Sequence, residues 1–495
     1  MRMLCLTVVF VAAVIAACTS NPESTAPRRL VRFQPLTVAV DSDSANLATT
    51  DTQLVKGWGL YPGGGNNPFY QWPRAESLLY NMGLTFIRDQ LDPALYDTGS
   101  TISDITLNSA QLTAYEAKWD SAKVHGMGYM LSVWSPPAAW KDSPGLDSGR
   151  LDSATGRPSF VAFMTVVMRN LNGSAPGLPL ALSIANEPDI GNTHYPSTPY
   201  DTALYELTLD NTRGSLNFAG YTGVVTLGPE VSALNVASSY LGDASFASID
   251  GGYFDSTAVG AFAVHTYGDV GWSSLSSFFN SHKRDVWMTE YSQPLSRGTS
   301  QIAHAIDLMG ALGAHFEILP TNYWAWWNGF AHADTDTTTS GTPGAGTLLL
   351  GHSGGSLEVT SMFYTLRKLF QNVTPGSAKV QYATSYYTKS SYPLVYSTSG
   401  QTGSQPRIDL YAFQETSPAK TIVVVSNWTS DDKRLTLIGL PSGYTTQQGY
   451  VSDSASTNAD MIMQTASTCW TPSGQTVART VLYAPARSVL IAVMN

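Results

Sequence analysis

The chain has 495 residues and a formal net charge of −10 at pH 7, because 37 acidic residues outnumber 27 basic ones. This acidic balance argues against nucleic acid and against an anionic membrane surface as partners. The length exceeds that of one usual domain. With only 3 cysteines the chain offers no disulfide framework, so its stability must come from burial of an apolar core.

The N-terminal segment has the pattern of an export signal. An apolar run over residues 4–17 is too short to span a membrane and ends in IAAC, which resembles a bacterial lipobox. We therefore expect residues 1–17 to be a signal peptide, residues 18–30 a polar tether, and Cys18 a lipidated residue and the protein's only membrane attachment. This predicts an exported protein of the bacterial cell envelope, periplasmic or at the cell surface. The alternative is an ordinary signal cleaved near the same place, with Cys18 incidental and the protein secreted.

A strand-then-helix rhythm occupies residues 51–375. Short apolar runs suit buried parallel strands, and helical patterns such as 109–125 and 159–170 lie between most of them. Strands are expected over 57–61, 85–90, 129–134, 180–186, 223–228, 261–267, 286–290 and 323–327. Strands alternating with helices in this way predict an α/β fold, a (β/α)8 TIM barrel.

After a helical pattern at 361–371 the rhythm changes. Residues 376–495 hold short alternating runs separated by Gly, Pro, Ser and Asp, which is typical of an antiparallel β-sandwich. The clearest runs are 408–413, 421–426, 434–438 and 488–493. Within residues 31–50, an alternating run predicts an N-terminal strand that contributes to the same sandwich.

Two of the expected barrel strands end in a glutamate. The run LALSIANEP stops at Pro188, which lacks the N–H that a continuing ladder needs, and leaves Glu187 at the strand's carboxyl end. The run VWMTE places Glu290 in the same position on the seventh strand. Carboxyl ends of barrel strands converge on one mouth, and two carboxylates about 5 Å apart suit retaining glycoside hydrolysis. The alternative is that each glutamate caps a helix or pairs with an arginine.

Other strand ends carry residues that suit a sugar site. We expect Arg88 and Tyr267 to donate to Glu290 and keep it ionised, whereas burial beside a second carboxylate predicts a raised pKa for Glu187. Asn186 is placed to bond a ring hydroxyl, and tryptophan faces suit stacking on sugar rings. His265 is a further candidate, with a hydrogen-bonded core residue as its alternative. The candidate substrate-binding residues are Arg88, Trp134, Asn186, His265, Tyr267, Trp324 and Trp326.

Several motifs carry a family resemblance. They are VWSPPAAWK (133–141), IANEPD (184–189), LGPE (227–230), HTYG (265–268), MTEYS (288–292), FYTLRKLFQNVTPGS (363–377) and YAPARSVLIAV (483–493). Together they resemble glycoside hydrolase family 30, whose members are (β/α)8 retaining enzymes with an attached β-sandwich. The resemblance implies Glu187 as acid/base and Glu290 as nucleophile. The first strand (GWGLYPGGG), the short span from Glu187 to Glu230 and the residues before Asn186 depart from the family's usual pattern, which leaves the substrate open.

Two competing chemistries find no support in the sequence. GHSGG at 351–355 matches a serine-hydrolase nucleophile elbow, but that fold needs a histidine downstream and none follows His352, so Ser353 lacks a base. No H-E-x-x-H or C-x-x-C motif occurs and the 8 histidines are scattered, so no metal and no cofactor is expected.

The substrate's charge follows from one span of the sequence. No Lys or Arg occurs from Gly298 to Leu366, a span that includes the eighth strand and its loop. This loop therefore has no cation that could bind a uronic acid, as one does in the family's glucuronoxylan-cleaving members. We predict a monomer acting on a neutral β-linked polysaccharide or oligosaccharide of plant or microbial origin, of xylan, galactan or glucan type. The alternative is a surface-anchored glycan-binding protein that kept the barrel and lost catalysis.

Overall fold

The computed structural model describes residues 34–40, 53–63, 72–96, 105–143, 145–191, 195–234, 236–237, 240, 259–267, 284–292, 301–332, 346–380, 382–384, 396–397, 400–401, 408–416, 419–438, 447–452, 459–462, 467–470 and 476–494. The expected signal peptide, tether and Cys18 lie outside these residues. The described chain divides into two compact units. One holds the helices and parallel strands between Gln53 and Lys379, and the other joins the strand at 34–40 to strands that follow residue 380.

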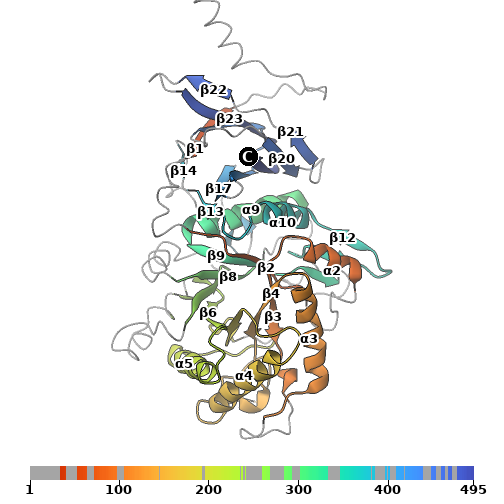
Figure 1. Cartoon of the computed structure of the whole chain (residues 1–495), viewed down its shortest axis with the longest axis vertical. Helices are drawn as coiled ribbons and strands as arrows, with labels where there is room; N and C mark the ends of the chain where they lie inside the picture. Colours follow the sequence, from red (N-terminus) through yellow and green to blue (C-terminus); the bar gives the residue numbers. More distant parts are fainter. Residues whose placement is uncertain are drawn as a thin grey trace, which may run out of the picture. The chain divides into compact units, whose positions relative to one another are not determined.

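Parallel strands in the first unit close into a barrel in the order β2-β3-β4-β5-β6-β7-β8-β9, with β2 paired to both β3 and β9 (Figure 1). The strands are β2 (Gly57–Leu60), β3 (Phe86–Leu91), β4 (Gly128–Val133), β5 (Ala181–Ser183), β6 (Val225–Val231), β7 (Ala261–His265), β8 (Val286–Tyr291) and β9 (Thr321–Trp326). The predicted (β/α)8 barrel is confirmed, and every expected strand overlaps an observed one.

A plug of apolar side chains fills the barrel. It consists of Phe86, Met130, Ala181, Leu227, Ala261, Ala263, Trp287 and Ala325, with Val225 and Tyr323 packed against it. Trp287 stacks on Tyr323 at 3.8 Å between ring centroids, and alanines on neighbouring strands leave room for these rings. A Cβ on Gly59 would lie 2.3 Å from the Phe86 ring, so glycine is required there. The packed interior leaves chemistry to the strand ends.

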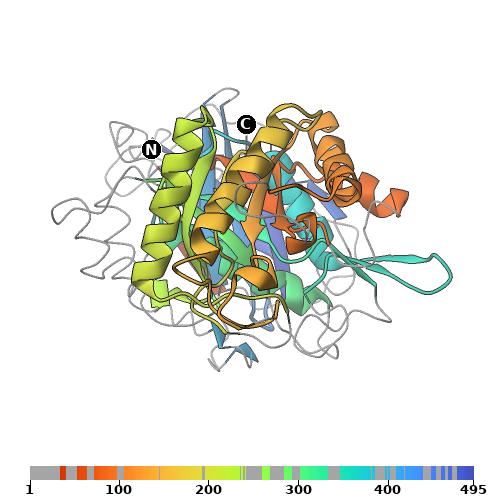
Figure 2. The same ribbon diagram turned by 90° about the horizontal axis from the view of Figure 1, so that it is seen from below.

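The helices of this unit are α2 (Pro73–Tyr80), α3 (Ser109–Val124), α4 (Gly156–Asn172), α5 (Thr202–Phe218), α9 (Gln301–Ile318) and α10 (Ser361–Asn372), with short 3-10 helices η3 (Pro93–Leu95) and η4 (Ala138–Trp140). Asn108, Asp201 and Thr360 begin α3, α5 and α10 by accepting a backbone N–H of the first turn. Helices α4 and α5 lie side by side (Figure 2). Within the described part of the chain, no helix combines the length and apolar character that crossing a membrane requires.

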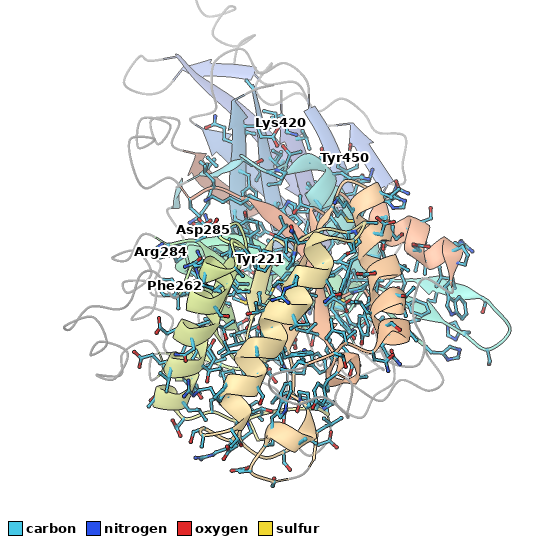
Figure 3. The ribbon with its side chains drawn as sticks, turned by 60° about the horizontal axis from the view of Figure 1, so that its bottom comes forward. Tyr221, Phe262, Arg284, Asp285, Lys420 and Tyr450 are labelled. Carbon is cyan, nitrogen blue, oxygen red and sulfur yellow. The ribbon has the colours of Figure 1, made fainter. Side chains whose placement is uncertain are left out.

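Charged, partly exposed residues lie at the amino-terminal end of the barrel. Arg284 and Asp285 lie together just before β8 (Figure 3). Lys56, just before β2, places its Nζ 2.7 Å from Asp285 Oδ1, and the two side chains are 41% and 32% exposed. In TIM barrels this end serves stability rather than chemistry.

A small sheet follows the last barrel strand. It consists of β10 (Phe330–His332), β11 (Leu349–Gly351) and β12 (Leu357–Val359), in that order. Ser353 lies in the turn between β11 and β12, not in a strand-to-helix elbow. This position agrees with its exclusion as a nucleophile. Short strands β13 (Ala378–Lys379), β15 (Tyr396–Ser397) and β16 (Gly400–Gln401) complete the elements grouped with the barrel unit.

The second unit is the predicted β-sandwich. One sheet has the order β14-β1-β19-β23-β22, and the other contains the run β17-β18-β24-β20-β21. Strand β1 pairs antiparallel with β14 but parallel with β19, which a strand can do when no short hairpin joins it to its partner. The strands are β1 (Gln34–Val40), β14 (Tyr382–Thr384), β17 (Ile408–Thr416), β18 (Ala419–Asn427), β19 (Lys433–Ile438), β20 (Gln447–Ser452), β21 (Ala459–Ile462), β22 (Ser467–Trp470), β23 (Thr476–Ala484) and β24 (Ser488–Met494).

Candidate active site

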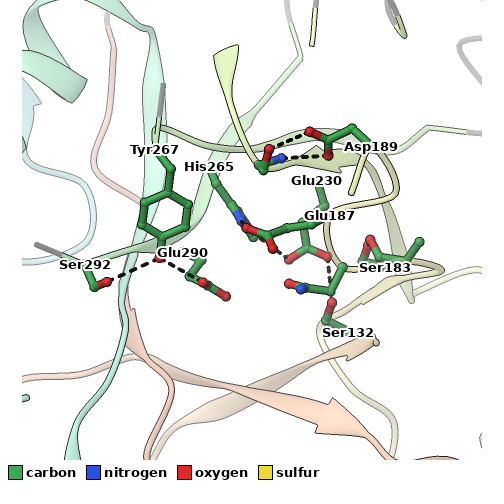
Figure 4. A network of polar contacts seen from close by, with 12 residues as sticks. Ser132, Ser183, Glu187, Asp189, Glu230, His265, Tyr267, Glu290 and Ser292 are labelled. Carbon is green, nitrogen blue, oxygen red and sulfur yellow. Dashed lines mark hydrogen bonds and ion pairs between the residues drawn. The ribbon is translucent and has the colours of Figure 1, made fainter. Parts of the chain in front are cut away.

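Both candidate catalytic glutamates lie at the carboxyl end of the barrel (Figure 4). Glu290 is near the end of β8, and Glu187 lies shortly after β5. One carboxylate oxygen of each and one ring nitrogen of His265 lie within 4.8 Å of one another. Glu187 and Glu290 are only 7% and 8% exposed. The two carboxylates therefore share one largely buried site.

Glu290 accepts a hydrogen bond on each oxygen from the two residues that we expected. Arg88 Nη1 donates to Oε2 at 2.7 Å, and the Tyr267 hydroxyl donates to Oε1 at 2.8 Å. Arg88 projects from β3 and its side chain is 1% exposed. A charge-assisted bond of this length is strong and directional. These two donors fix the orientation of the Glu290 carboxylate.

Glu187 is held by a different pair of donors. His265 Nδ1 lies 3.1 Å from Oε1, and the Tyr195 hydroxyl donates to Oε2 at 2.5 Å. His265 is thus part of the site. Tyr195 lies in the segment between β5 and α5, where sequence reasoning did not find it, because no local pattern marks a side chain that returns to a strand end.

A third carboxylate, Glu230, lies beneath the pair. It is 0% exposed and accepts hydrogen bonds from Arg88 Nε at 3.0 Å and from Ser132 Oγ at 2.7 Å. Strand β6 carries an irregularity between Pro229 and Val231, and Glu230 has a φ of 54° in the left-handed region. We expected β6 to end at Gly228 and gave Glu230 no role. The LGPE motif, a carboxylate at the end of an apolar strand, was the signal that would have found it.

The charges in this cluster raise the pKa of His265 and lower the pKa of Glu230. Burial acts to lower the pKa of His265, but the charge of Glu290 and its contacts with Glu187 and Glu230 raise it to about 9. Burial acts to raise the pKa of Glu230, but Arg88 and His265 hold it at about 2. At neutral pH His265 therefore carries a positive charge and Glu230 a negative one.

The pKa values of the two catalytic candidates shift in opposite directions. Burial acts to raise the pKa of Glu187, but the hydrogen bond and charge of His265, together with Tyr195 and Arg88, lower it below its ordinary value. Burial raises the pKa of Glu290 above its ordinary value, although His265 and Arg88 oppose the shift. Our expectation of a raised pKa for Glu187 is therefore wrong, because the sequence did not place these donors beside it.

Asn186 has a contact that we did not expect. Its Oδ1 accepts a hydrogen bond from Arg88 Nη2 at 2.5 Å, and the residue is 3% exposed. The amide therefore helps to fix the guanidinium plane. Its contact with a ring hydroxyl of a substrate stays a prediction.

Tyr195, which bonds Glu187, belongs to an aromatic cluster that includes one of the three expected tryptophans. Trp134, just after β4, lies 5.2 Å from Trp327 and 5.7 Å from Tyr195, measured between ring centroids. Trp327 stacks on Tyr61 at 4.0 Å. Trp134 and Trp327 are partly exposed, so they offer flat apolar faces to a sugar ring.

Trp324 and Trp326 lie outside this cluster, and the expectation that they bind substrate is wrong. They are 0% and 1% exposed. Their indole N–H groups donate to His315 Nδ1 and to the Gly346 carbonyl, each at 2.8 Å. Successive strand residues point to opposite faces. In β9 the barrel interior is taken by Ala325, so Trp324 and Trp326 face the surrounding helices and loops.

Trp324 nevertheless contributes to the site indirectly, through hydrogen bonds to buried residues. Because its N–H donates to His315 Nδ1, the ring proton of His315 is on Nε2, which lies 2.8 Å from Thr266 Oγ1. Burial lowers the pKa of His315 to about 3, so the ring is neutral. Thr266 lies between His265 and Tyr267 in the sequence. The hydrogen bonds from Trp324 through His315 to Thr266 therefore hold in place the segment that carries His265 and Tyr267.

Among the described residues, Glu187, His265 and Glu290 form the one acid and histidine cluster whose ligand atoms are close enough for a metal ion. The residues do not fit that role well. Arg88 and Tyr195 already bond carboxylate oxygens of the cluster, and the positive charges of Arg88 and His265 repel a cation. The arrangement suits acid–base and nucleophilic chemistry by carboxylates.

Comparison with known proteins agrees with this architecture. No family model and no curated protein matches the sequence. Solved structures do match: the catalytic domain of a family 30 xylanase C from Talaromyces cellulolyticus is 16% identical with a TM-score of 0.67, covering 93% of this chain and 100% of that one. A family 30 subfamily 8 xylanase from Clostridium acetobutylicum is 17% identical with a TM-score of 0.66, covering 93% and 99%.

An endo-β-1,6-glucanase is 14% identical with a TM-score of 0.63, and the match covers 94% of this chain and 95% of that chain. At such identities a match shows the fold alone. The chain therefore shares the fold of these family 30 structures, as the motifs predicted.

Proposed function

We propose that this protein is a retaining glycoside hydrolase that cleaves β-linked neutral glycans, with Glu187 as acid/base and Glu290 as nucleophile. The observation that carries the proposal is the pair of buried carboxylates whose oxygens lie within 4.8 Å at the carboxyl end of the barrel. This proximity supports a retaining mechanism, because the two carboxyl groups of inverting enzymes are about 6.5–9.5 Å apart to leave room for a water.

The donors around each carboxylate support separate roles. Glu290 attacks the anomeric carbon while Arg88 and Tyr267 hold its oxygens, and a glycosyl ester forms as the bond to the leaving oxygen breaks. Glu187 gives its proton to that leaving oxygen and then takes one from the water that hydrolyses the ester.

The proposed roles require a proton on Glu187 and an ionised Glu290 when the bond breaks. A glycosidic oxygen next to Glu187 accepts its proton and stabilises the protonated form. Positive charge that develops on the sugar stabilises the ionised form of Glu290. Both effects of the bound substrate favour the protonation states that the proposed roles require.

The residues around the pair support a neutral glycan. Trp134, Trp327 and Tyr61 present apolar rings, which suit the C–H faces of sugars. Arg88 and His265 are committed to carboxylates, and Lys141 Nζ is held by Ser135 Oγ at 3.0 Å and two backbone carbonyls. In the described part of the mouth, these cations leave no free charge for a uronic acid. Xylan, galactan and glucan types all fit.

One experiment tests the mechanism directly. A panel of neutral polysaccharides is screened for reducing sugar, and the first-formed anomer is identified by proton NMR on the best substrate. Retention is expected, together with labelling of the Glu290 peptide by a 2-deoxy-2-fluoro glycoside. Inversion, or labelling of Glu187 instead, would overturn the assignment of roles. Absence of turnover on every glycan, with binding intact, would favour a non-catalytic glycan-binding protein.

We also propose that Cys18 carries a lipid anchor in the cell envelope, on the lipobox-like sequence that precedes it. Membrane fractionation of the full chain and of Cys18→Ser tests this. The wild-type protein is expected with the membranes and the variant in the soluble fraction. A wild-type protein found soluble in the periplasm or medium would contradict the proposal.

A further inference from the structure

Glu230 contacts both cations of the site but is not itself accessible. Its Oε1 lies 2.9 Å from Arg88 Nη2 and 3.7 Å from His265 Nε2, and its side chain is 0% exposed. Ser132 Oγ donates to the other oxygen at 2.7 Å. Because no substrate atom can reach it, Glu230 cannot be the acid, the base or the nucleophile.

We propose that Glu230 is a positioning residue that orients Arg88 and His265 toward the two catalytic carboxylates. The proposal rests on the function proposed for Glu187 and Glu290. It assigns the relative placement of those two groups to a third carboxylate, Glu230, which lies close to Glu187 and His265 (Figure 4).

The Arg88 guanidinium links its contact with Glu230 to its contact with Glu290. Its Nε and Nη2 face Glu230, and its Nη1 donates to Glu290 at 2.7 Å. A guanidinium is planar, so fixing one edge on Glu230 fixes the direction in which Nη1 points. A lysine or an unanchored arginine would reach Glu290 without a defined direction.

The His265 ring lies between Glu230 and the other catalytic group, and its link to Glu230 is electrostatic, because Nε2 is 3.7 Å from Glu230 Oε1. Nδ1 lies 3.1 Å from Glu187 Oε1, while Nε2 faces Glu230. With a carboxylate beside each nitrogen, the doubly protonated ring is the form that suits both contacts. The Glu230 backbone adds a third link, because its carbonyl accepts the Glu187 N–H at 3.0 Å.

The test compares Glu230→Gln with Asp89→Asn in the full chain. Asp89 is the matched control: it is 2% exposed, adjoins Arg88 in β3, and pairs with Lys118 Nζ at 2.6 Å and Trp119 Nε1 at 2.7 Å, away from the site. Four quantities are measured: kcat, the pH profile, the melting temperature, and the titration of His265 by ¹⁵N NMR. A His265→Gln sample identifies the signal.

For Glu230→Gln we expect kcat to fall by about 10²-fold, because donors displaced by a fraction of an ångström no longer align the pair. The pKa of His265, which Glu290, Glu187 and Glu230 together raise to about 9, should fall, because one of these three negative charges is gone. The alkaline limb of activity should move with it. Asp89→Asn should lower the melting temperature without moving either titration.

An unchanged His265 titration and an unchanged pH profile in Glu230→Gln would overturn the proposal. It would also be overturned if Glu230→Gln and Asp89→Asn lost kcat equally and in proportion to their losses in melting temperature. If Glu230→Gln does not fold, Ser132→Ala decides. It removes one hydrogen bond from Glu230, and a smaller shift in the same direction supports the proposal while none overturns it. If the wild type turns over no glycan, the proposed function fails, but the NMR titration still decides whether Glu230 controls His265.

Discussion

The two ends of the barrel use ion pairs of the same length in opposite ways. At the carboxyl end, Arg88 Nη1 lies 2.7 Å from Glu290 Oε2, with side chains 1% and 10% exposed. At the amino end, Lys56 Nζ lies 2.7 Å from Asp285 Oδ1, with side chains 41% and 32% exposed. Distance alone does not distinguish them, but their access to water does.

Burial decides what each pair is worth. An exposed pair contributes about 0–1 kcal/mol, because water solvates both charges and salt screens them. Burying a charge costs several kcal/mol of hydration free energy, and a buried pair regains this only when its hydrogen bonds are complete. The carboxyl end keeps Arg88, His265, Glu187, Glu230 and Glu290 together in spite of that cost. Such a concentration of buried charge indicates chemistry rather than stability.

The largest expected effect comes from removing Glu290, the proposed nucleophile. Glu290→Ala should lower kcat by roughly 10⁴-fold or more, on natural and on activated substrates alike, because no other group can form the ester. Initial rates on a polysaccharide and on an aryl glycoside measure the loss. A variant that keeps a tenth of wild-type activity would exclude Glu290 as nucleophile.

Removing the acid should have a smaller and more selective effect. Glu187→Ala should lose roughly 10²–10⁴-fold in rate on natural glycosides. The loss in the glycosylation step should shrink when the leaving group is a good one that needs no proton. Pre-steady-state rates on a series of aryl glycosides check this, and equal losses across the series would contradict the role.

Trp324 and Trp327 are three residues apart and differ in exposure, so replacing each in turn separates a role in stability from a role in substrate binding. Trp327→Ala should raise KM about tenfold, because a stacking face is lost, with little change in stability. Trp324→Ala should lower the free energy of unfolding by about 3–5 kcal/mol, with KM nearly unchanged in the folded fraction. Urea unfolding and steady-state kinetics on both variants separate the roles, and a KM effect confined to Trp324 would reverse them.

The charge on His265 predicts a pH dependence of stability. Its pKa is raised from 6.5 to about 9 in the folded protein, so its contribution is fully present below pH 6.5 and is lost as the pH rises through about 9. Melting temperatures measured across this range should fall more steeply for the wild type than for His265→Gln. Parallel curves would show that His265 does not titrate in this window.

The smallest effect is expected at the amino end. Lys56→Ala should change the free energy of unfolding by less than about 1 kcal/mol and leave kcat and KM unchanged. Thermal unfolding at low and high salt, with kinetics alongside, provides the check. A loss of activity would show that the two ends are coupled, and the contrast between them would no longer hold.

The sequence by itself determined the barrel, the sandwich and the strand ends that carry Glu187 and Glu290. Apolar runs of strand length and the stop at Pro188 are local signals, and parallel strands bring their carboxyl ends together whatever lies between them. The contacts of Arg88 and Tyr267 with Glu290 also followed from strand position.

Only the tertiary structure decided which side chains of a strand face the site and how charged groups meet. Along β9, a shift of one residue separates the buried Trp326 from Trp327, because side chains alternate between faces. The irregularity in β6 turned Glu230 into the interior. The pKa of Glu187 depended on His265 and Tyr195, which lie far from it or beyond a loop, and the electrostatics of a site depend on such distances rather than on sequence patterns.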